Sequence, residues 1–248
     1  GGGDGYAIPA SRFSNEDILF CIDVGQETMS EMKVTGSGGR PFTRLDAIKQ
    51  AIMLFLHAKV AINPDHRYAL CALSKSLEWV RKEFSSDVDS AIAALRGLTV
   101  DMSSSYADLT HLFKVANHEA KKSRSQSRIF RLILIYCRSS TPPQYQLPPS
   151  SQKLFTLDVL YLHDKPGPDN CPQVVYDTLV EALEQVSEYE GYIFEMGQGL
   201  MRTIFRNMAL LLSHPQQRCL QDDLDLPKSL VKKSVTGETS QGDEGVVV

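Results

Sequence analysis

Short apolar runs alternate with polar loops and amphipathic stretches along most of the chain. The apolar runs cover residues 18–23, 68–73, 77–80, 129–136, 155–162 and 192–196. A continuous apolar run bounded by polar residues is typical of a strand buried on both faces of a sheet. The pattern therefore predicts six strands, of which 129–136 is the most apolar and is expected to be central.

Between these runs, apolar residues recur at spacings of three and four, as expected for helices. The stretches cover residues 43–62, 87–98, 106–121, 174–186 and 200–213. In the first, Thr43 is a suitable N-cap, and the stretch 101–105 is expected to cap the third. Six strands alternating with five helices predict an α/β fold, a doubly wound, mostly parallel six-stranded sheet with helices on both faces and 77–80 as an antiparallel edge.

The two ends of the chain lack this pattern. Residues 1–12 are predicted to form a flexible N-terminal segment, 13–213 one domain, and 214–248 a C-terminal segment with a flexible polar tail. The Gly-rich stretch 27–42 is expected to be a loop. Because the sequence opens with three glycines in place of Met, we expect a processed or truncated N-terminus.

The composition of the chain mainly excludes classes of function and of structure. With 26 basic and 30 acidic residues the net charge is −4, which argues against nucleic acid as the main partner. No stretch approaches the roughly 18 apolar residues of a membrane span, and no signal-peptide pattern is present. The 5 cysteines are scattered, so they predict no disulfide framework and fit the cytosol or nucleus.

Asp23 ends the first predicted strand, where open α/β sheets place their ligands. In domains of the von Willebrand factor A type this place reads Asp-x-Ser-x-Ser and helps to hold Mg²⁺, with a Thr before the third helix and an Asp after the fourth strand. Here Gly25 and Glu27 replace the two serines, and Arg138 follows the strand 129–136. Only Ser103–Ser105 offer a further hydroxyl. We interpret this as a degenerate metal site and expect no metal or other cofactor.

Other catalytic motifs are missing from the sequence. It contains neither Gly-x-Ser-x-Gly nor His-Glu-x-x-His, and Gly36-Ser-Gly38-Gly39 lacks the Lys of a phosphate loop. We therefore predict that the protein is not an enzyme. Two alternatives stay open. One is a Mg-dependent ligand-binding A domain of another intracellular complex, and the other is a hydrolase with Cys137 or Cys171 as its nucleophile.

The stretch after the last predicted helix reads Ser213-His214-Pro215-Gln216-Gln217-Arg218. A Pro-x-x-Arg segment just past a folded domain suits recognition in a groove, because Pro fixes an extended shape and Arg supplies a forked donor. The alternative is that Pro215 merely stops the helix.

These segments together resemble one family, the von Willebrand A-like subunit of the BRISC and ARISC deubiquitinase assemblies, BRISC complex member 1. The resemblance covers about residues 17–220, and its most specific part is the final His-Pro-x-Gln-Arg run. The segments that carry it are 18–23, 128–136, 142–149, 158–163 and 210–218. The family's acidic N-terminal extension is not in this sequence. Differences from the animal members predict a divergent, non-animal member.

The resemblance implies a von Willebrand A-like, non-catalytic scaffold or adaptor. In the family, this subunit binds a UEV-domain subunit. It thereby helps to hold together an assembly whose metalloprotease subunit, with its own scaffold partner, cleaves lysine-63-linked ubiquitin chains. Carried over to this sequence, the docking residues are His214, Pro215, Gln217 and Arg218. The resemblance also implies roles in ubiquitin signalling and the DNA damage response, in cytoplasm and nucleus, without nucleic acid or membrane as a partner.

Overall fold

The computed structural model describes residues 13–35, 37–102, 106–148, 152–197 and 200–224. Within these residues, six strands form one sheet in the order β5-β4-β1-β6-β7-β8. Five run parallel: β1 (Glu16–Asp23), β4 (Arg67–Leu73), β6 (Ile129–Tyr136), β7 (Thr156–Leu162) and β8 (Ile193–Met196). The edge strand β5 (Leu77–Ser85) is antiparallel and extends beyond the predicted 77–80. The predicted fold class is confirmed.

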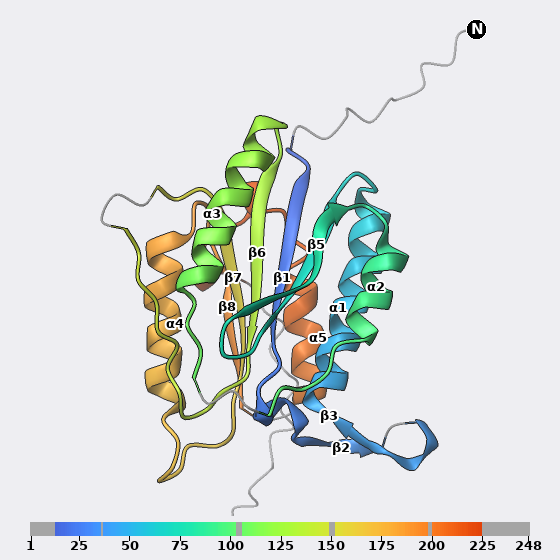
Figure 1. The fold of residues 1–248 in the computed structure, drawn as a ribbon, viewed down its shortest axis with the longest axis vertical. Helices are drawn as coiled ribbons and strands as arrows, with labels where there is room; N and C mark the ends of the chain where they lie inside the picture. The colour runs from blue at the N-terminus through green and yellow to red at the C-terminus, as the bar shows by residue number, and fades with distance from the viewer. Residues whose placement is uncertain (1–12, 36, 103–105, 149–151, 198–199, 225–248) are drawn as a thin grey trace, which may run out of the picture.

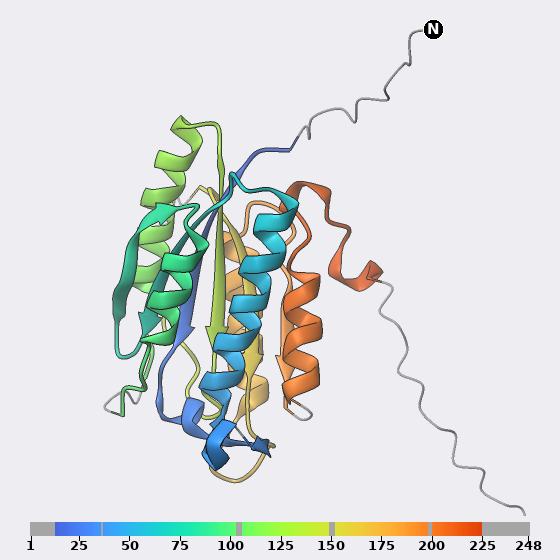
Figure 2. The ribbon, with the colours of Figure 1, turned by 90° about the vertical axis from the view of Figure 1, so that its right-hand side faces the viewer.

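Helices cover both faces of the sheet (Figures 1 and 2). One face carries α1 (Arg44–Ile62), α2 (Val88–Arg96) and α5 (Leu200–Leu210), and the other carries α3 (Thr110–Ser125) and α4 (Pro172–Val186). None of the helices in the described part of the chain has the length and apolar character needed to cross a membrane.

Two helix starts differ in how well the sequence predicted them. Thr43 caps α1 as expected, because its Oγ1 accepts from the Asp46 amide at 3.2 Å while its own amide donates to Asp46 at 3.0 Å. The predicted start of the third helix at residue 106 is wrong. Asp108 forms a parallel bridge with Gln144, and the helix begins only at Thr110, whose amide donates to the Asp108 carboxylate at 2.8 Å. The serines expected to cap this helix, 103–105, lie outside the described residues.

The stretch 27–42 is not an irregular loop throughout. It contains the antiparallel hairpin of β2 (Glu31–Thr35) and β3 (Pro41–Thr43), which projects beyond the carboxyl ends of the large sheet (Figure 1). Gly38 and Gly39 lie in its turn with φ of 79° and 75°, a conformation that favours glycine. The described residues also contain four short 3₁₀ turns: Gln26–Met29, Ser37–Gly39, Pro215–Gln217 and Gln221–Asp223.

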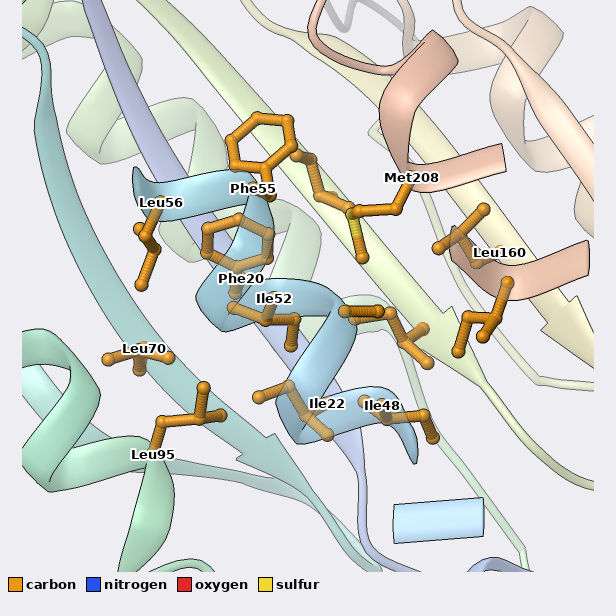
Figure 3. Close-up of a cluster of buried hydrophobic side chains, with 14 of the residues drawn as sticks. Phe20, Ile22, Ile48, Ile52, Phe55, Leu56, Leu70, Leu95, Leu160 and Met208 are labelled. Carbon is orange, nitrogen blue, oxygen red and sulfur yellow. The ribbon is translucent and has the colours of Figure 1, made fainter. Parts of the chain in front are cut away.

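The core against α1, α2 and α5 fixes the central strands. Phe20 of β1 meets Phe55 of α1 edge to face, with ring centroids 5.4 Å apart (Figure 3). Every residue of β1 is buried, so Glu16 at its amino end and Asp23 at its carboxyl end are both 0 % exposed. Buried charges require partners, and the two ends of this strand therefore identify the two polar centres of the domain.

Candidate functional site

Asp23 lies at the carboxyl end of β1, as predicted, and both of its carboxylate oxygens have partners. The Arg138 guanidinium donates from Nε to Oδ2 at 3.0 Å and from Nη2 to Oδ1 at 3.1 Å. The backbone amides of Gly25 and Cys137 donate at 2.9 and 3.0 Å. Burial disfavours the charged guanidinium, but the attraction of Asp23 outweighs it and raises the pKa of Arg138. Asp23 is thus neutralised by a cation that belongs to the protein.

These residues do not fit a Mg²⁺ ion, which needs several open oxygen ligands in an octahedron. Glu27 accepts from the Ser139 amide and from Ser139 Oγ, both at 2.7 Å, so its carboxylate is also engaged. A Cβ on Gly25 would lie 3.1 Å from Asp23 Oδ1 and 3.4 Å from Arg138 Nε. A serine at position 25, as a metal-binding motif requires, would therefore crowd the Asp23–Arg138 pair. The other candidate ligands, Ser103–Ser105, lie outside the described residues.

Other polar side chains at the carboxyl end of the sheet are also engaged in hydrogen bonds and ion pairs with one another. Ser139 Oγ accepts from the Asp164 amide at 2.7 Å, and Arg44 forms an ion pair with Asp164 and approaches Glu27 to 3.9 Å. Among the residues that the structure describes, no group of three His, Cys, Asp or Glu side chains is placed to share a metal ion.

The two candidate cysteine nucleophiles are placed differently. Cys137 is fully buried behind Asp23, and burial together with that carboxylate strongly raises the pKa of its thiol. A reactive cysteine needs a stabilised thiolate, so Cys137 is unsuited to this role. Cys171 is partly exposed just before α4, and its thiol donates to the Ser140 carbonyl at 3.5 Å.

A second polar centre lies at the amino ends of the strands, around Asp158 of β7. Arg131 donates from Nε to Asp158 Oδ2 at 2.7 Å. Arg218 donates from Nη1 to Oδ1 at 2.6 Å and from Nη2 to Oδ2 at 3.0 Å. Burial opposes ionisation, but the two guanidinium groups outweigh it and lower the pKa of Asp158 to about 2. Asp158 is therefore held as a carboxylate between two arginines.

The cluster continues through Glu16, which pairs with Arg131 at 3.2 Å and with Lys59 of α1. His66 accepts from the Glu16 amide through Nδ1 at 2.9 Å, and burial lowers the pKa of His66 to about 4. The imidazole is thus neutral at neutral pH, as an accepting Nδ1 requires. Sequence analysis missed this cluster. Its only local signal is a charged residue inside an apolar run, at Arg131 and at Asp158.

The four predicted docking residues have different positions. Pro215 is buried, and the Arg218 side chain is 0 % exposed, with its guanidinium 4.4 Å from the centre of the Tyr192 ring. His214 is half-buried, with Nε2 2.8 Å from the Ser14 carbonyl oxygen. Gln217 is exposed. Their contact with a partner stays a prediction, and a contact through the Arg218 guanidinium requires that it leave Asp158.

The sequence matches no family model. It is similar to the curated protein BRISC and BRCA1-A complex member 1 of Xenopus laevis, with 24 % identity over 219 residues that cover 83 % of this chain and 65 % of that protein. The human protein of the same name is 24 % identical and is covered to 66 %. The chain thus spans about two thirds of the length of the curated relatives it matches.

Among solved structures, a point mutant of the PilB minor pilin from Streptococcus sanguinis has a TM-score of 0.53 at 13 % identity, covering 83 % of this chain and 63 % of that one. The SpRpn10 VWA domain has a TM-score of 0.49 at 12 % identity and covers 79 % of this chain and 95 % of that domain.

The strand order, the antiparallel edge and the helices on both faces define a von Willebrand A-like α/β domain. Within this class, the chain is similar over 83 % of its length to the proteins named BRISC and BRCA1-A complex member 1, which supports a divergent member of that family. Its predicted origin outside the animals stays a prediction.

Proposed function

We propose that the chain is a non-catalytic scaffold or adaptor subunit of a multiprotein deubiquitinase assembly of the BRISC and ARISC type. The observation that carries this proposal is the Asp23–Arg138 pair at the carboxyl end of the sheet. A carboxylate bound on both oxygens by a buried guanidinium has no free position for a metal or a substrate. The similarity to complex member 1 along most of the chain supports the assignment to the assembly.

In this proposal the chain binds the UEV-domain subunit through the segment that begins at His214. It thereby helps to hold the metalloprotease subunit and its scaffold partner in an assembly that cleaves lysine-63-linked ubiquitin chains. The relatives' names join BRISC with BRCA1-A. These names support a role of the chain in ubiquitin signalling and the DNA damage response, in the cytoplasm and the nucleus.

Copurification and cleavage assays together test the proposal. The chain is coexpressed with the UEV-domain subunit, the metalloprotease subunit and its scaffold partner, and the assembly is recovered through a tag on the UEV-domain subunit. We expect the chain in the recovered assembly and cleavage of lysine-63-linked ubiquitin dimers by the assembly. We expect no cleavage by the chain alone. Cleavage by the isolated chain, or its loss from the assembly, would contradict the proposal.

A further inference from the structure

A groove of about 400 Å³ lies beside α3, between this helix and the connection from β6 to β7 that runs back along it (Figure 1). In the first turn of α3, Thr110 Oγ1 accepts from the Gln146 amide at 2.9 Å. In the last turn, Arg124 donates to the Leu154 carbonyl at 3.4 Å. The two walls are therefore fixed to each other at both ends of the helix, and the groove between them is preformed.

The wall that α3 supplies is basic. Lys114, His118 and Lys121 line the groove and follow one another at spacings of four and three, so they share one side of the helix. All three residues are exposed, and none of them forms an ion pair with another residue that the structure describes. The adjacent Lys122, by contrast, is paired with Glu119 at 2.8 Å. In a chain of net charge −4, this basic stripe favours an acidic occupant.

Between the members of the basic stripe, Asn117 also lines the groove. Its Oδ1 is buried and has no hydrogen-bond partner in the described part of the chain. A buried acceptor without a partner costs free energy, so a ligand that supplies a donor here gains affinity. The last side-chain torsion of Asn is soft, and its turning presents Oδ1 to a main-chain N–H in the groove.

We propose that the groove binds an extended segment of a partner protein in which acidic and apolar residues alternate. In an extended chain, every second side chain points the same way, with a repeat of about 6.7 Å. Four residues of helix, from Lys114 to His118, rise about 6 Å, so successive acidic side chains match the basic stripe. The apolar side chains between them then face the partly buried Leu147 and Leu154 on the opposite wall.

Other anionic ligands fit the groove less well. Single-stranded nucleic acid is held by stacking on aromatic rings, whereas Phe113, the aromatic residue that lines the groove, is only 1 % exposed. A phosphate group is best held by guanidinium forks or by converging main-chain amides. No arginine is among the described residues that line the groove, and its ammonium groups are spaced along the helix. This spacing suits a row of carboxylates.

The test measures binding of the full chain to fluorescein-labelled heptapeptides by fluorescence anisotropy. The probe is Glu-Val-Glu-Val-Glu-Val-Glu, and its affinity should fall as salt is added, because the contacts are ionic and exposed. One control peptide has Gln in place of every Glu, and a second has the four Glu residues grouped before the three Val residues. The alternating peptide should bind more tightly than both, by about tenfold or more over the Gln peptide.

Two sets of variants locate the binding. Lys114→Glu with Lys121→Glu should lower the affinity for the alternating peptide by about tenfold or more. The matched control is Lys165→Glu with Arg202→Glu, which makes the same change in net charge at exposed residues outside the groove and should leave the affinity unchanged. Asn117→Leu should weaken binding by about threefold without lowering the melting temperature, because it removes a buried acceptor that lacks a partner in the free chain.

Several results would overturn the inference. Equal binding of the grouped and alternating peptides, or an equal loss in the control pair of variants, would show attraction without a defined site. A lower melting temperature of Asn117→Leu with unchanged affinity would give this residue a structural role only. A labelled heptamer of deoxythymidine that binds as tightly as the acidic peptide would indicate a nucleic-acid site instead. All of these measurements use the chain alone, so their failure would leave the proposed function standing.

Discussion

Two buried arginine–aspartate pairs lie at opposite ends of the same sheet. Arg138 donates hydrogen bonds to Asp23 at the carboxyl end, and Arg218 donates hydrogen bonds to Asp158 at the amino end, each from two nitrogens. Arg138 lies two residues after the end of β6, whereas Arg218 lies beyond α5. The same chemistry thus closes a place where a ligand would bind at one end and fastens a segment of chain at the other.

The pairs also differ in how fully each arginine is satisfied. Arg218 uses all three nitrogens, since it donates to Ser213 Oγ at 3.2 Å and to the Glu190 carbonyl at 2.9 Å as well as to Asp158. Arg138 Nη1 is buried and has no hydrogen-bond partner in the described part of the chain. If Arg138 is lost, Asp23 still accepts hydrogen bonds from two backbone amides. If Asp158 is lost, two full positive charges are left without the carboxylate between them. The amino-end pair should therefore contribute more to stability.

The largest effect is expected for Asp158→Ala, which leaves Arg131 and Arg218 buried beside each other without their shared carboxylate. Removing one partner of a buried ion pair costs about 3–5 kcal/mol, and we expect the upper part of that range here. Urea denaturation measures the free energy of unfolding. The exposed Asp177→Ala on α4 is the control and should stay within about 0.5 kcal/mol of the unmodified chain. A similarly small loss for Asp158→Ala would remove the distinction between the pairs.

Arg138→Gln should cost less, about 3 kcal/mol, because the Gly25 and Cys137 amides continue to stabilise Asp23. The control is Arg40→Gln, since Arg40 is 67 % exposed in its pair with Asp46 and such surface pairs contribute at most about 1 kcal/mol. The same denaturation measurement applies. A loss larger than that of Asp158→Ala would reverse the ranking of the two ends.

The pH dependence sharpens the comparison further, because His66 belongs only to the amino-end cluster. Its pKa is about 4 in the folded chain against an ordinary value of 6.5, so protonation favours the unfolded state. Stability is fully present above pH 6.5 and is lost as pH falls toward 4, and His66 should account for about 2 kcal/mol of the difference between pH 8 and pH 5. His66→Asn, which keeps an acceptor for the Glu16 amide, should flatten this slope. An unchanged slope would show that other groups cause it.

How far the sequence predicts this molecule depends on whether the signal is local. The apolar run ending at Asp23 correctly predicted β1, and Thr43 correctly predicted the start of α1, because both depend on neighbouring residues. The hairpin of β2 and β3 was missed because its glycines also suit an irregular loop. The start of α3 was misplaced because a contact with Gln144, far along the chain, decides it.

The amino-end cluster could not be predicted for the same reason. Arg131, Asp158 and Arg218 come from three separate elements, and no local spacing links them. The segment ending in Pro215 and Arg218 was recognised as a unit, but its sequence does not reveal that the arginine faces inward. Burial of this guanidinium depends on a carboxylate from β7 and on the ring of Tyr192, the residue just before β8.

The smallest expected effect is on divalent cations, where the closed carboxyl end predicts no response. Isothermal titration of the chain with Mg²⁺ and with Mn²⁺ should give no binding heat, because a cation would have to displace Arg138 from Asp23 and would gain no free ligand from Glu27. Arg138→Gln provides the matched variant, since it frees one side of Asp23 while Gly25 still lacks the hydroxyl that a metal-binding motif supplies. A micromolar isotherm with the unmodified chain, lost in Asp23→Ala, would show that the arginine yields to a metal. The Asp23–Arg138 pair would then open when a metal ion binds, whereas the Asp158–Arg218 pair would stay closed.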